Sequence, residues 1–393
     1  MDIMQQGVIT LLKSAVTGEK LDLPRGFDLA QAYPRIRAHH MTTLVYTGAV
    51  NCGIDRRLPV MQQLFQGYCR ALQVCECQMH ALNRVFAAFD AEGIDYLPMK
   101  GSMMRALYPR PELRMMGDAD VLIRLEQYER IVPILQKLGF VEGPEGEHHY
   151  AWKSDALCLE LHKTLFQLHI LERFEYFRDA WPYAHAQIGT RYAMDEENTF
   201  AYLFTHFSKH YSGAGIGCRH VVDLWVYLRS HPHMDEAKLE AILTQLNLHV
   251  FYKNIRRLIA VWFEGAEPDE KTEFISQIVF SNGSWGSYSN ATLNEGARDL
   301  QKTGSAAGSR LKYIARRVFP SLEHLSGYYP VLRKAPWLFP VMWCAYLLGK
   351  AKMLRTLWRK HSRQMNLLSR SALENRMKML EFVGLTDDVS QTD

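Results

Sequence analysis

The sequence predicts an α+β fold, in which a small mixed β-sheet lies between an N-terminal and a C-terminal helical region. Three observations support this prediction. Residues 1–90 carry apolar side chains at helical spacing, residues 91–190 contain short apolar or alternating runs, and helical spacing returns from Asn198 onward. We therefore expect three regions: an N-terminal helical region at 1–90, the α/β core at 91–190, and a C-terminal helical domain at 191–393.

The first part of the core is an apolar run at 94–99, which predicts a strand. The turn Gly101-Ser102 follows and leads into a short helical stretch. Pro109 and Pro111 force a loop after it, because proline cannot donate the backbone hydrogen bond that a helix requires.

The second part of the core begins with a predicted strand at 119–124 and an amphipathic helix at 126–138, which Gly139 closes. Two alternating runs at 149–153 and 157–162 follow, separated by a short turn. This pattern is typical of a β-hairpin.

Two acidic side chains lie where the loop meets the second strand. Asp118 and Asp120 are two residues apart, so on a strand they project from the same face. Two carboxylates on one face repel each other unless a cation lies between them, and oxygen ligands suit Mg²⁺ or Mn²⁺. The Gly101-Ser102 turn nearby offers backbone N–H groups and a hydroxyl group to a phosphate.

A third carboxylate is available on the later strand. Glu160 and His162 alternate with leucines in the run at 157–162, so they share its polar face. Alone, this pattern also fits a half-exposed strand with ordinary polar residues facing outward. Beside an Asp-x-Asp motif, we favour Glu160 as a third metal ligand and His162 as its support.

The pattern Lys100-Gly101, Tyr108, Arg114 and Asp118-x-Asp120 resembles the polymerase-β-type nucleotidyltransferases. It is most similar to the branch called the uncharacterised nucleotidyltransferase family. The superfamily takes its third metal carboxylate from a later strand, and Glu160-Leu161-His162 fits the family's Glu-Leu-His at that place. The 15 residues between Ser102 and Asp118 make a slightly longer spacing than is usual in the superfamily.

The resemblance extends into the C-terminal helical domain. The family carries a His-x-x-Lys-His helix, a glycine-containing loop, a basic residue and an aspartate, which His206, Lys209, His210, Arg219 and Asp223 match in order. On this basis we expect Lys209 and Arg219 to contact nucleotide phosphates, while Asp223 holds the Arg219 guanidinium. The alternative is a surface salt bridge on a helix.

The resemblance implies a Mg²⁺- or Mn²⁺-dependent nucleotidyltransferase that moves a nucleoside monophosphate from a nucleoside triphosphate, with ATP the first choice, to an acceptor. The implied catalytic and metal-binding residues are Asp118, Asp120 and Glu160. The implied nucleotide-binding residues are Lys100, Gly101, Ser102, Lys209 and Arg219, and the supporting residues are Arg114, His162, His206, His210 and Asp223. The acceptor stays open between a small hydroxyl compound, a tRNA end and a protein side chain. The alternative function is a non-catalytic module that binds a nucleotide or RNA.

Charge is distributed unevenly along the 393 residues. The formal net charge is only +4, but residues 310–378 contain 15 Lys and Arg against Glu323 and Glu374. This excess favours a polyanionic partner, with RNA the first candidate and a membrane surface the second. The alternative is that these cations only solvate helices.

Other features limit the class of protein. The seven cysteines show no paired CxxC motif, and the N-terminus lacks the features of a signal peptide, so we expect a cytoplasmic protein with free thiols. The longest apolar stretch, 335–348, is shorter than the roughly 20 residues that a membrane span needs, so we expect no transmembrane span. The Gly/Ser/Asn-rich stretch 280–308 predicts a flexible loop.

Overall fold

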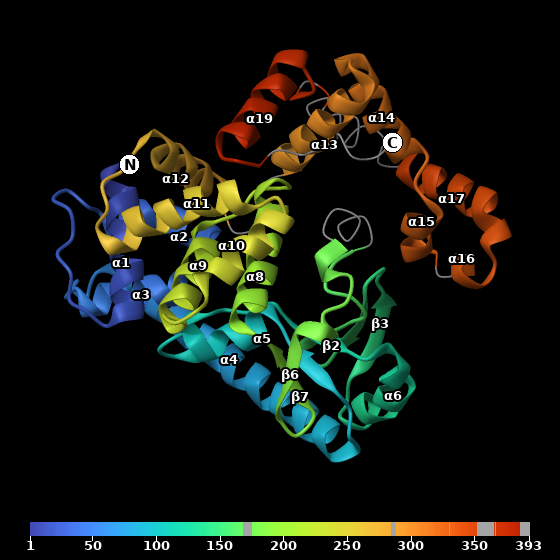
Figure 1. Ribbon diagram of the computed structural model, residues 1–393, viewed down its shortest axis with the longest axis horizontal. Coiled ribbons are helices and arrows are strands. Elements are labelled where there is room, and N and C mark those ends of the chain that lie inside the picture. The colour runs from blue at the N-terminus through green and yellow to red at the C-terminus, as the bar shows by residue number, and fades with distance from the viewer. Residues whose placement is uncertain (168–174, 284–287, 330, 352–364, 366, 386–393) are drawn as a thin grey trace. The chain divides into compact units, whose positions relative to one another are not determined.

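The computed structural model describes the whole chain except residues 168–174, 284–287, 330, 352–364, 366 and 386–393 (Figure 1). The chain divides into two compact units, and each is described by itself below. Unit 1 comprises Met1–Ser208 and Gly217–Ser284, and unit 2 comprises Lys209–Ile216 and Trp285–Asp393.

Helices form the N-terminal region, as predicted. They are α1 (Ile3–Thr17), α2 (Leu29–Ala38), α3 (Thr42–Asn51) and α4 (Pro59–Glu92). Local sequence sets their ends: Asp2 and Gln5 form a capping box at the start of α1, and Pro59 occupies the first turn of α4. Gly93 ends α4 in the left-handed conformation, with a φ of 65°, which glycine adopts without steric cost.

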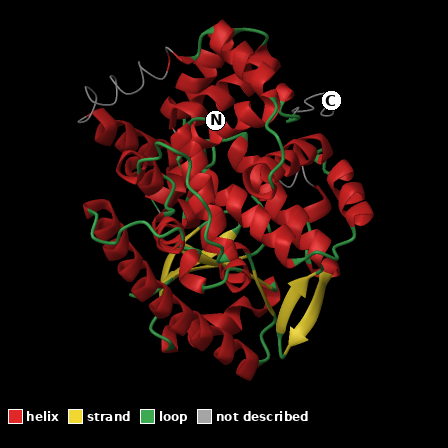
Figure 2. Cartoon of the chain, turned by 90° about the vertical axis from the view of Figure 1, so that its left-hand side faces the viewer, coloured by secondary structure: helices red, strands yellow, loops and turns green. Residues whose placement is uncertain are grey.

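The strands of unit 1 form one mixed sheet, which confirms the predicted α+β class (Figure 2). The strands are β1 (Tyr96–Pro98), β2 (Asp118–Ile123), β3 (Val141–Glu145), β4 (His149–Lys153), β5 (Cys158–His162), β6 (Ala184–Ile188) and β7 (Arg191–Met194). Among the described residues their order is β3-β4-β5-β2-β1-β7-β6. The predicted hairpin is β4–β5, and β5 also pairs in parallel with β2.

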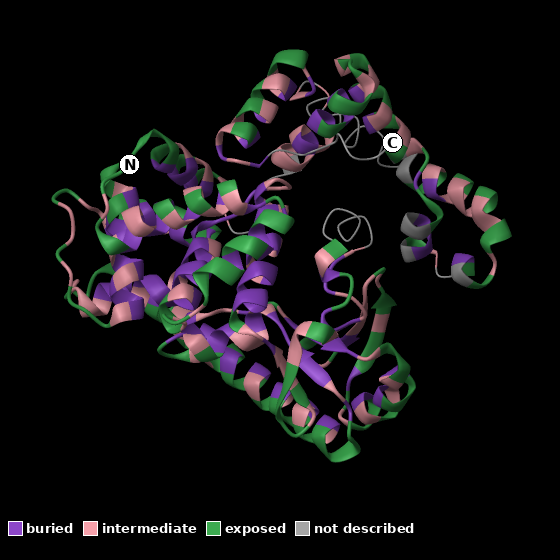
Figure 3. Ribbon diagram, in the orientation of Figure 1, coloured by how far each residue is buried: buried purple, intermediate pink, exposed green. Residues whose placement is uncertain are grey.

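The two faces of β2 and β5 differ in polarity, because successive strand residues point to opposite sides. Ala119, Val121, Leu159 and Leu161 are fully buried on one face. There they pack with apolar residues of α4 and of α6 (Tyr128–Lys137), so α4 and α6 contribute to the same core (Figures 1 and 3). The other face carries the polar residues of both strands.

Five further helices follow the sheet in the sequence and complete unit 1. They are α8 (Glu196–Tyr211), whose last residues are grouped with unit 2, α9 (Cys218–Ser230), α10 (Glu236–Gln245), α11 (His249–Ile259) and α12 (Glu270–Asn282). The helix α9 is buried along most of its length, from Cys218 to Tyr227. Trp225 on α9 stacks on Phe263, in the π-helical turn Ala260–Glu264 that follows α11, at a centroid distance of 4.1 Å.

Unit 2 is helical. Its helices are α13 (Tyr288–Thr303), α14 (Ala306–Val318), α15 (Leu322–Tyr328), α16 (Val331–Lys334), α17 (Phe339–Ala351) and α19 (Arg370–Phe382). A small core of Leu300, Tyr313, Leu368 and Leu373 joins α13, α14 and α19.

The prediction of a flexible loop at 280–308 is wrong for most of its length, since α12 continues to Asn282 and α13 and the start of α14 fill 288–308. One of the glycines that suggested a loop is a packing position. A Cβ atom on Gly296 would lie 2.4 Å from Leu368 Cδ2, so a larger residue on α13 would require this leucine to move. Tertiary packing therefore outweighs the low helix propensity of this composition.

Two sequence-based expectations concern the whole chain. All seven cysteines are free thiols. Among the described residues, no helix combines the length and the apolar character that crossing a bilayer would require.

Candidate active site

The polar face of the sheet holds a buried charged cluster around Asp120. This carboxylate is 3% exposed, and its Oδ1 accepts hydrogen bonds from Lys100 Nζ at 2.7 Å and from His162 Nε2 at 2.8 Å. Burial alone would raise the pKa of Asp120, but the Lys100 charge and the His162 hydrogen bond hold the pKa well below its usual range. Asp120 is therefore ionised throughout the physiological pH range.

Glu160 lies directly beside Asp120, because the two are register partners on the parallel strands β2 and β5. Its Oε2 lies 3.4 Å from His162 Nε2, and its Oε1 lies 3.7 Å from His149 Nε2. The hydrogen bond from His162 lowers the pKa of Glu160, and burial opposes this only in part. One imidazole nitrogen thus faces both carboxylates.

Asp118 is half-buried at the start of β2 and projects from the same face. Burial raises its pKa, and the charges of Asp120 and Glu160 raise it further, while Lys100 opposes them. Three carboxylates thus influence one another around a single lysine, and the imidazoles of His162 and His149 are neighbouring groups that can also carry positive charge. With both imidazoles neutral, the cluster has an excess of negative charge.

Among the described residues, Asp120, Glu160 and His162 are the one group of three whose possible metal-ligand atoms all lie within 4.8 Å of one another. The sequence-based set of Asp118, Asp120 and Glu160 shares two members with this group. His162, which we expected only to support the metal ligands, is thus a member of the group, whereas Asp118 is not. Asp118 lies two residues before Asp120 on β2.

The turn before the cluster is held by its own contacts. Lys100 has a φ of 42°, which is uncommon for a residue with a Cβ atom and places its ammonium group against Asp120. Gly101 lies in the first turn of the short helix α5 (Lys100–Met104) in contact with Met116, where a Cβ atom would lie 2.8 Å from Met116 Cγ. The Ser102 hydroxyl donates to the Met99 carbonyl at 2.6 Å and lies 3.1 Å from the Asp120 carbonyl. These contacts fix α5 to β2.

A second ion pair joins the loop before β2 to α9. Arg114 Nε lies 2.8 and 3.0 Å from the two carboxylate oxygens of Asp223, and the Tyr108 hydroxyl donates to the same carboxylate at 2.7 Å. Asp223 thus holds Arg114 and Tyr108, and its charge also acts on Arg219, which we expected it to hold. Tyr108 is fully buried, and burial followed by the Asp223 charge raises its pKa well above the usual value.

Arg219 is buried on α9 close to this pair. Burial lowers its pKa to about 10, and the Arg114 charge lowers it as well, while Asp223, Tyr108 and Asp118 oppose the shift. Two guanidinium groups therefore lie near one another with the charge of Asp118 in range. This arrangement places positive charge next to the acidic cluster.

The remaining predicted residues lie on α8. His206 is half-buried, four residues after Tyr202, and so on the same side of the helix. Lys209 and His210 occupy the last turn of α8, in the segment grouped with unit 2. Their roles toward a nucleotide stay predictions.

Sequence reasoning missed one residue at the site, Tyr202. It is 1% exposed, and its hydroxyl has no hydrogen-bond partner among the described residues. Burial raises its pKa, Lys100 opposes this, and Asp120 and Glu160 reinforce it, so the phenol lies within electrostatic range of the cluster. In the sequence Tyr202 is one of many aromatic residues on an apolar helix face, and no local motif distinguishes it.

His149 was also missed as a site residue. It opens β4 as the register partner of His162, and the two rings lie 5.6 Å apart between centroids. Burial lowers its pKa, which the Glu160 charge opposes. Its place in the predicted hairpin, opposite the Glu-Leu-His run, was the one signal that could have identified it.

Comparison with known proteins supplies one match. The model of the family described as Uncharacterised nucleotidyltransferase matches residues 25–264, more than half of the chain. The chain belongs to the uncharacterised nucleotidyltransferase family. This nucleotidyltransferase family match contains the whole acidic cluster, the Arg114–Asp223 pair and α8, and it ends before α12. Neither the curated proteins nor the solved structures gave a match.

Membership in the nucleotidyltransferase family supports a nucleotidyl transfer role for the chain. The structure adds a buried cluster of acidic and histidine side chains that could hold a metal ion within the matched residues. Unit 2 lies outside the match except for its short segment Lys209–Ile216.

Proposed function

We propose that the chain transfers a nucleoside monophosphate from a nucleoside triphosphate to an acceptor hydroxyl and releases pyrophosphate. The acceptor oxygen forms a bond to the α-phosphorus, and the bond from this phosphorus to the oxygen bridging to the β-phosphorus breaks. The observation that carries the proposal is the placement of Asp118, Asp120 and Glu160 on one face of two paired strands.

The donor set fits a divalent cation. Three carboxylates around one lysine leave negative charge that a cation would balance, and Asp120, Glu160 and His162 already bring their ligand atoms together. Carboxylate oxygens suit Mg²⁺ and Mn²⁺. We propose that Asp118, Asp120 and Glu160 hold this cation, which when bound would stabilise the negative charge on the reacting phosphate.

His162 has a separate role in this arrangement. Its Nε2–H group faces Asp120 and Glu160 together, and these hydrogen bonds raise the pKa of His162 although burial opposes the shift. An imidazole that donates to two carboxylates fixes the direction of their remaining oxygens. We therefore assign His162 to positioning the carboxylates.

Positive groups beside the cluster would bind the triphosphate. Lys100 and Arg219 both have charge interactions with Asp118, so we assign them to triphosphate oxygens, whereas the nearby Arg114 is already paired with Asp223. We assign Gly101 and Ser102 to the β- and γ-phosphates, where the Ser102 hydroxyl would exchange the Met99 carbonyl for a phosphate oxygen. Lys209 is assigned to the nucleotide on the family pattern alone.

Glu160 is the proposed acceptor of the proton that the attacking hydroxyl loses. It is ionised, half-buried and more exposed than Asp120, so an acceptor can reach it. The protein's own contribution is then the positioning of charge before the reaction begins.

The test uses the full-length chain with each of the four nucleoside triphosphates labelled at the α-phosphate, in the presence of Mg²⁺ or Mn²⁺ and a cell extract. Transfer appears as label on an acceptor with a matching amount of pyrophosphate. We expect ATP to be used, and we expect Asp118→Asn with Asp120→Asn to reduce transfer by at least about a thousandfold.

Asp155→Asn is the matched control, because this exposed carboxylate lies in the β4–β5 turn away from the cluster. Transfer that survives the double substitution would remove the assignment of the active site. If the chain binds a nucleotide but releases no pyrophosphate with any acceptor fraction, the result favours the non-catalytic binding module.

For the acceptor, we propose RNA as the first candidate on the basis of the charge of residues 310–378. Contacts inside unit 2 already engage part of that charge: Arg316 pairs with Glu295 and Asp299, and Arg370 pairs with Glu374. Five of the 15 cations lie in 352–364, outside the described residues. Incubation with fractionated RNA, small metabolites and proteins separates the acceptor classes.

A further inference from the structure

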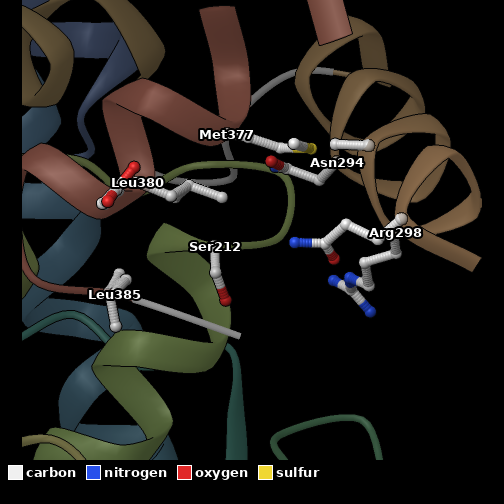
Figure 4. Close-up of a pocket in the computed structure, with 9 residues that line it drawn as sticks. Ser212, Asn294, Arg298, Met377, Leu380 and Leu385 are labelled. Carbon is white, nitrogen blue, oxygen red and sulfur yellow. The ribbon is translucent and has the colours of Figure 1, made fainter. Parts of the chain in front are cut away.

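Unit 2 contains a small cavity that has no part in the proposed transfer site. It has a volume of about 190 Å³ and lies between α13, α19 and the segment after α8. The lining includes the apolar side chains of Met377, Leu380 and Leu385 and the polar side chains of Ser212, Asn294 and Arg298 (Figure 4). The cavity therefore offers both apolar and polar contacts. All of these residues except Ser212 lie outside the family match.

A buried positive charge contacts Asn294, one of the polar residues that line the cavity. Arg376 on α19 is 7% exposed, and its Nε donates to Asn294 Oδ1 at 2.7 Å. The amide of Asn294 donates in turn to the Gly213 carbonyl, so both ends of this side chain are engaged. Asn294 thus lies between the guanidinium and the cavity.

Arg376 lacks a counter-ion within the part of the chain that the structure describes. Its second contact, from Nη2 to the Tyr211 carbonyl at 3.4 Å, is to the last residue of α8. A helix C-terminus offers only about half a negative charge, so a net positive charge remains buried. Burying an uncompensated guanidinium is costly, and an anion in the adjoining cavity would reduce this cost.

The charges on the rim define the class of anion. Arg298 is exposed on α13 and lines the cavity, while Glu381 adds one negative charge to the lining. Together with Arg376 they give a net charge of +1, which matches a monoanion better than a dianion. The apolar side chains of Met377, Leu380 and Leu385 suit the aliphatic part of a ligand.

We propose that this cavity binds a small aliphatic monocarboxylate, with its carboxylate toward Arg298 and the Ser212 hydroxyl and its chain against α19. Arg376 acts through Asn294 as a positioning charge. The cavity is below the roughly 300 Å³ at which pockets for larger ligands begin, so a nucleotide does not fit. The site is independent of the proposed transfer reaction.

The test is calorimetric titration of the full-length chain with 4-methylpentanoate, and with inorganic phosphate and 4-methylpentylamine as comparison probes. We expect 4-methylpentanoate to bind in the low millimolar range or tighter, and to bind more tightly than either comparison probe. Arg298→Gln should weaken binding about tenfold, because a charge-assisted hydrogen bond is lost. Lys302→Gln, which removes an exposed charge from the same helix outside the cavity, should leave binding unchanged.

Arg376→Met tests the buried charge, and Arg376→Lys is its conservative variant. If Arg376 acts as proposed, Arg376→Met abolishes carboxylate binding, Arg376→Lys restores part of it, and unfolding without ligand shows little loss of stability for either. Asp118→Asn with Asp120→Asn should still bind the carboxylate, which separates this cavity from the transfer site. No binding of 4-methylpentanoate, or binding that Arg298→Gln leaves unchanged, would overturn the proposal.

Discussion

The two units bury charge of opposite sign. In unit 1, Asp118, Asp120 and Glu160 exceed the single lysine among them, whereas in unit 2 Arg376 is buried without a carboxylate partner among the described residues. Uncompensated charge is costly inside a protein, and such sites are associated with ligand binding. This difference in buried charge is the basis of our two proposals, a divalent cation in unit 1 and a small monoanion in unit 2.

The largest expected effect separates two neighbouring acids of unit 1. Asp120→Asn should destabilise the ligand-free protein by about 3–5 kcal/mol, because it leaves Lys100 and His162 without their shared partner. Asp118→Asn should leave stability unchanged or raise it, because it removes repulsion from Asp120 and Glu160. Urea unfolding of both variants at neutral pH measures this difference. Equal destabilisation would show that Asp118 is as well compensated as Asp120.

The same two acids should also differ in how they make folding stability depend on pH. The pKa of Asp118 is raised from 3.8, so its ionised form opposes folding at neutral pH, and this penalty disappears as the pH falls through the raised value. The pKa of Asp120 is lowered from 3.8, so its stabilisation is complete above that value and is lost as the pH falls through the lowered one. The wild type should therefore approach Asp118→Asn first on acidification, and Asp120→Asn only at lower pH. Unfolding curves measured across this range would contradict the assignment if the order were reversed.

Glu160→Gln tests the role of this carboxylate in catalysis. We expect turnover to fall about a hundredfold with a smaller change in nucleotide affinity, because the proton acceptor matters most as the transition state forms. His162→Asn should cost less, since an amide can still donate to one of the two carboxylates. Steady-state kinetics and nucleotide titration measure both variants. If turnover required His162 and not Glu160, our assignment of Glu160 as proton acceptor and His162 as positioning residue would be wrong.

Tyr202→Phe tests whether the acidic cluster uses the buried hydroxyl. Removing a hydroxyl without a partner should leave the free energy of unfolding unchanged or raise it by about 1 kcal/mol, and should lower kcat/KM. Tyr227→Phe is the matched control, because its buried hydroxyl donates to the Glu196 carbonyl at 2.9 Å and its loss should cost about 1 kcal/mol. If both substitutions lower stability equally and leave kinetics unchanged, Tyr202 has only a packing role.

The smallest effect concerns the basic segment of unit 2. Reversal of Arg355, Arg359 and Lys360 to Glu should weaken tRNA binding and reduce its dependence on salt between about 50 and 200 mM, while nucleotide affinity is kept. These three residues lie outside the described part of the chain, so the prediction depends on composition alone. Filter binding measures it. If the wild type does not bind tRNA at low salt, the basic segment is not an RNA-binding site, and the small cavity is then the one anion site that we propose in unit 2.

Local sequence determined much of the unit 1 core. The Asp-x-Asp spacing, the alternating Glu160-Leu161-His162 run and the hairpin turn define which residues share a strand face, because strand side chains alternate regardless of context. The family resemblance rested on these same short motifs and is confirmed by the match to residues 25–264. Helix caps such as Asp2 and Gly93 also act through neighbouring residues only.

Only the tertiary structure decided the partners of the buried charges. Asp223 binds Arg114, which is 109 positions away, and Tyr202 reaches the cluster from a helix that follows all its acids. Arg376 meets Asn294 and Tyr211 across 82 and 165 positions. Helical spacing is the same for a residue that faces an apolar core and for one that faces a charge, so the sequence could not distinguish these roles. The physical reason is that electrostatic and packing energies depend on distance in space, which folding sets across the whole unit.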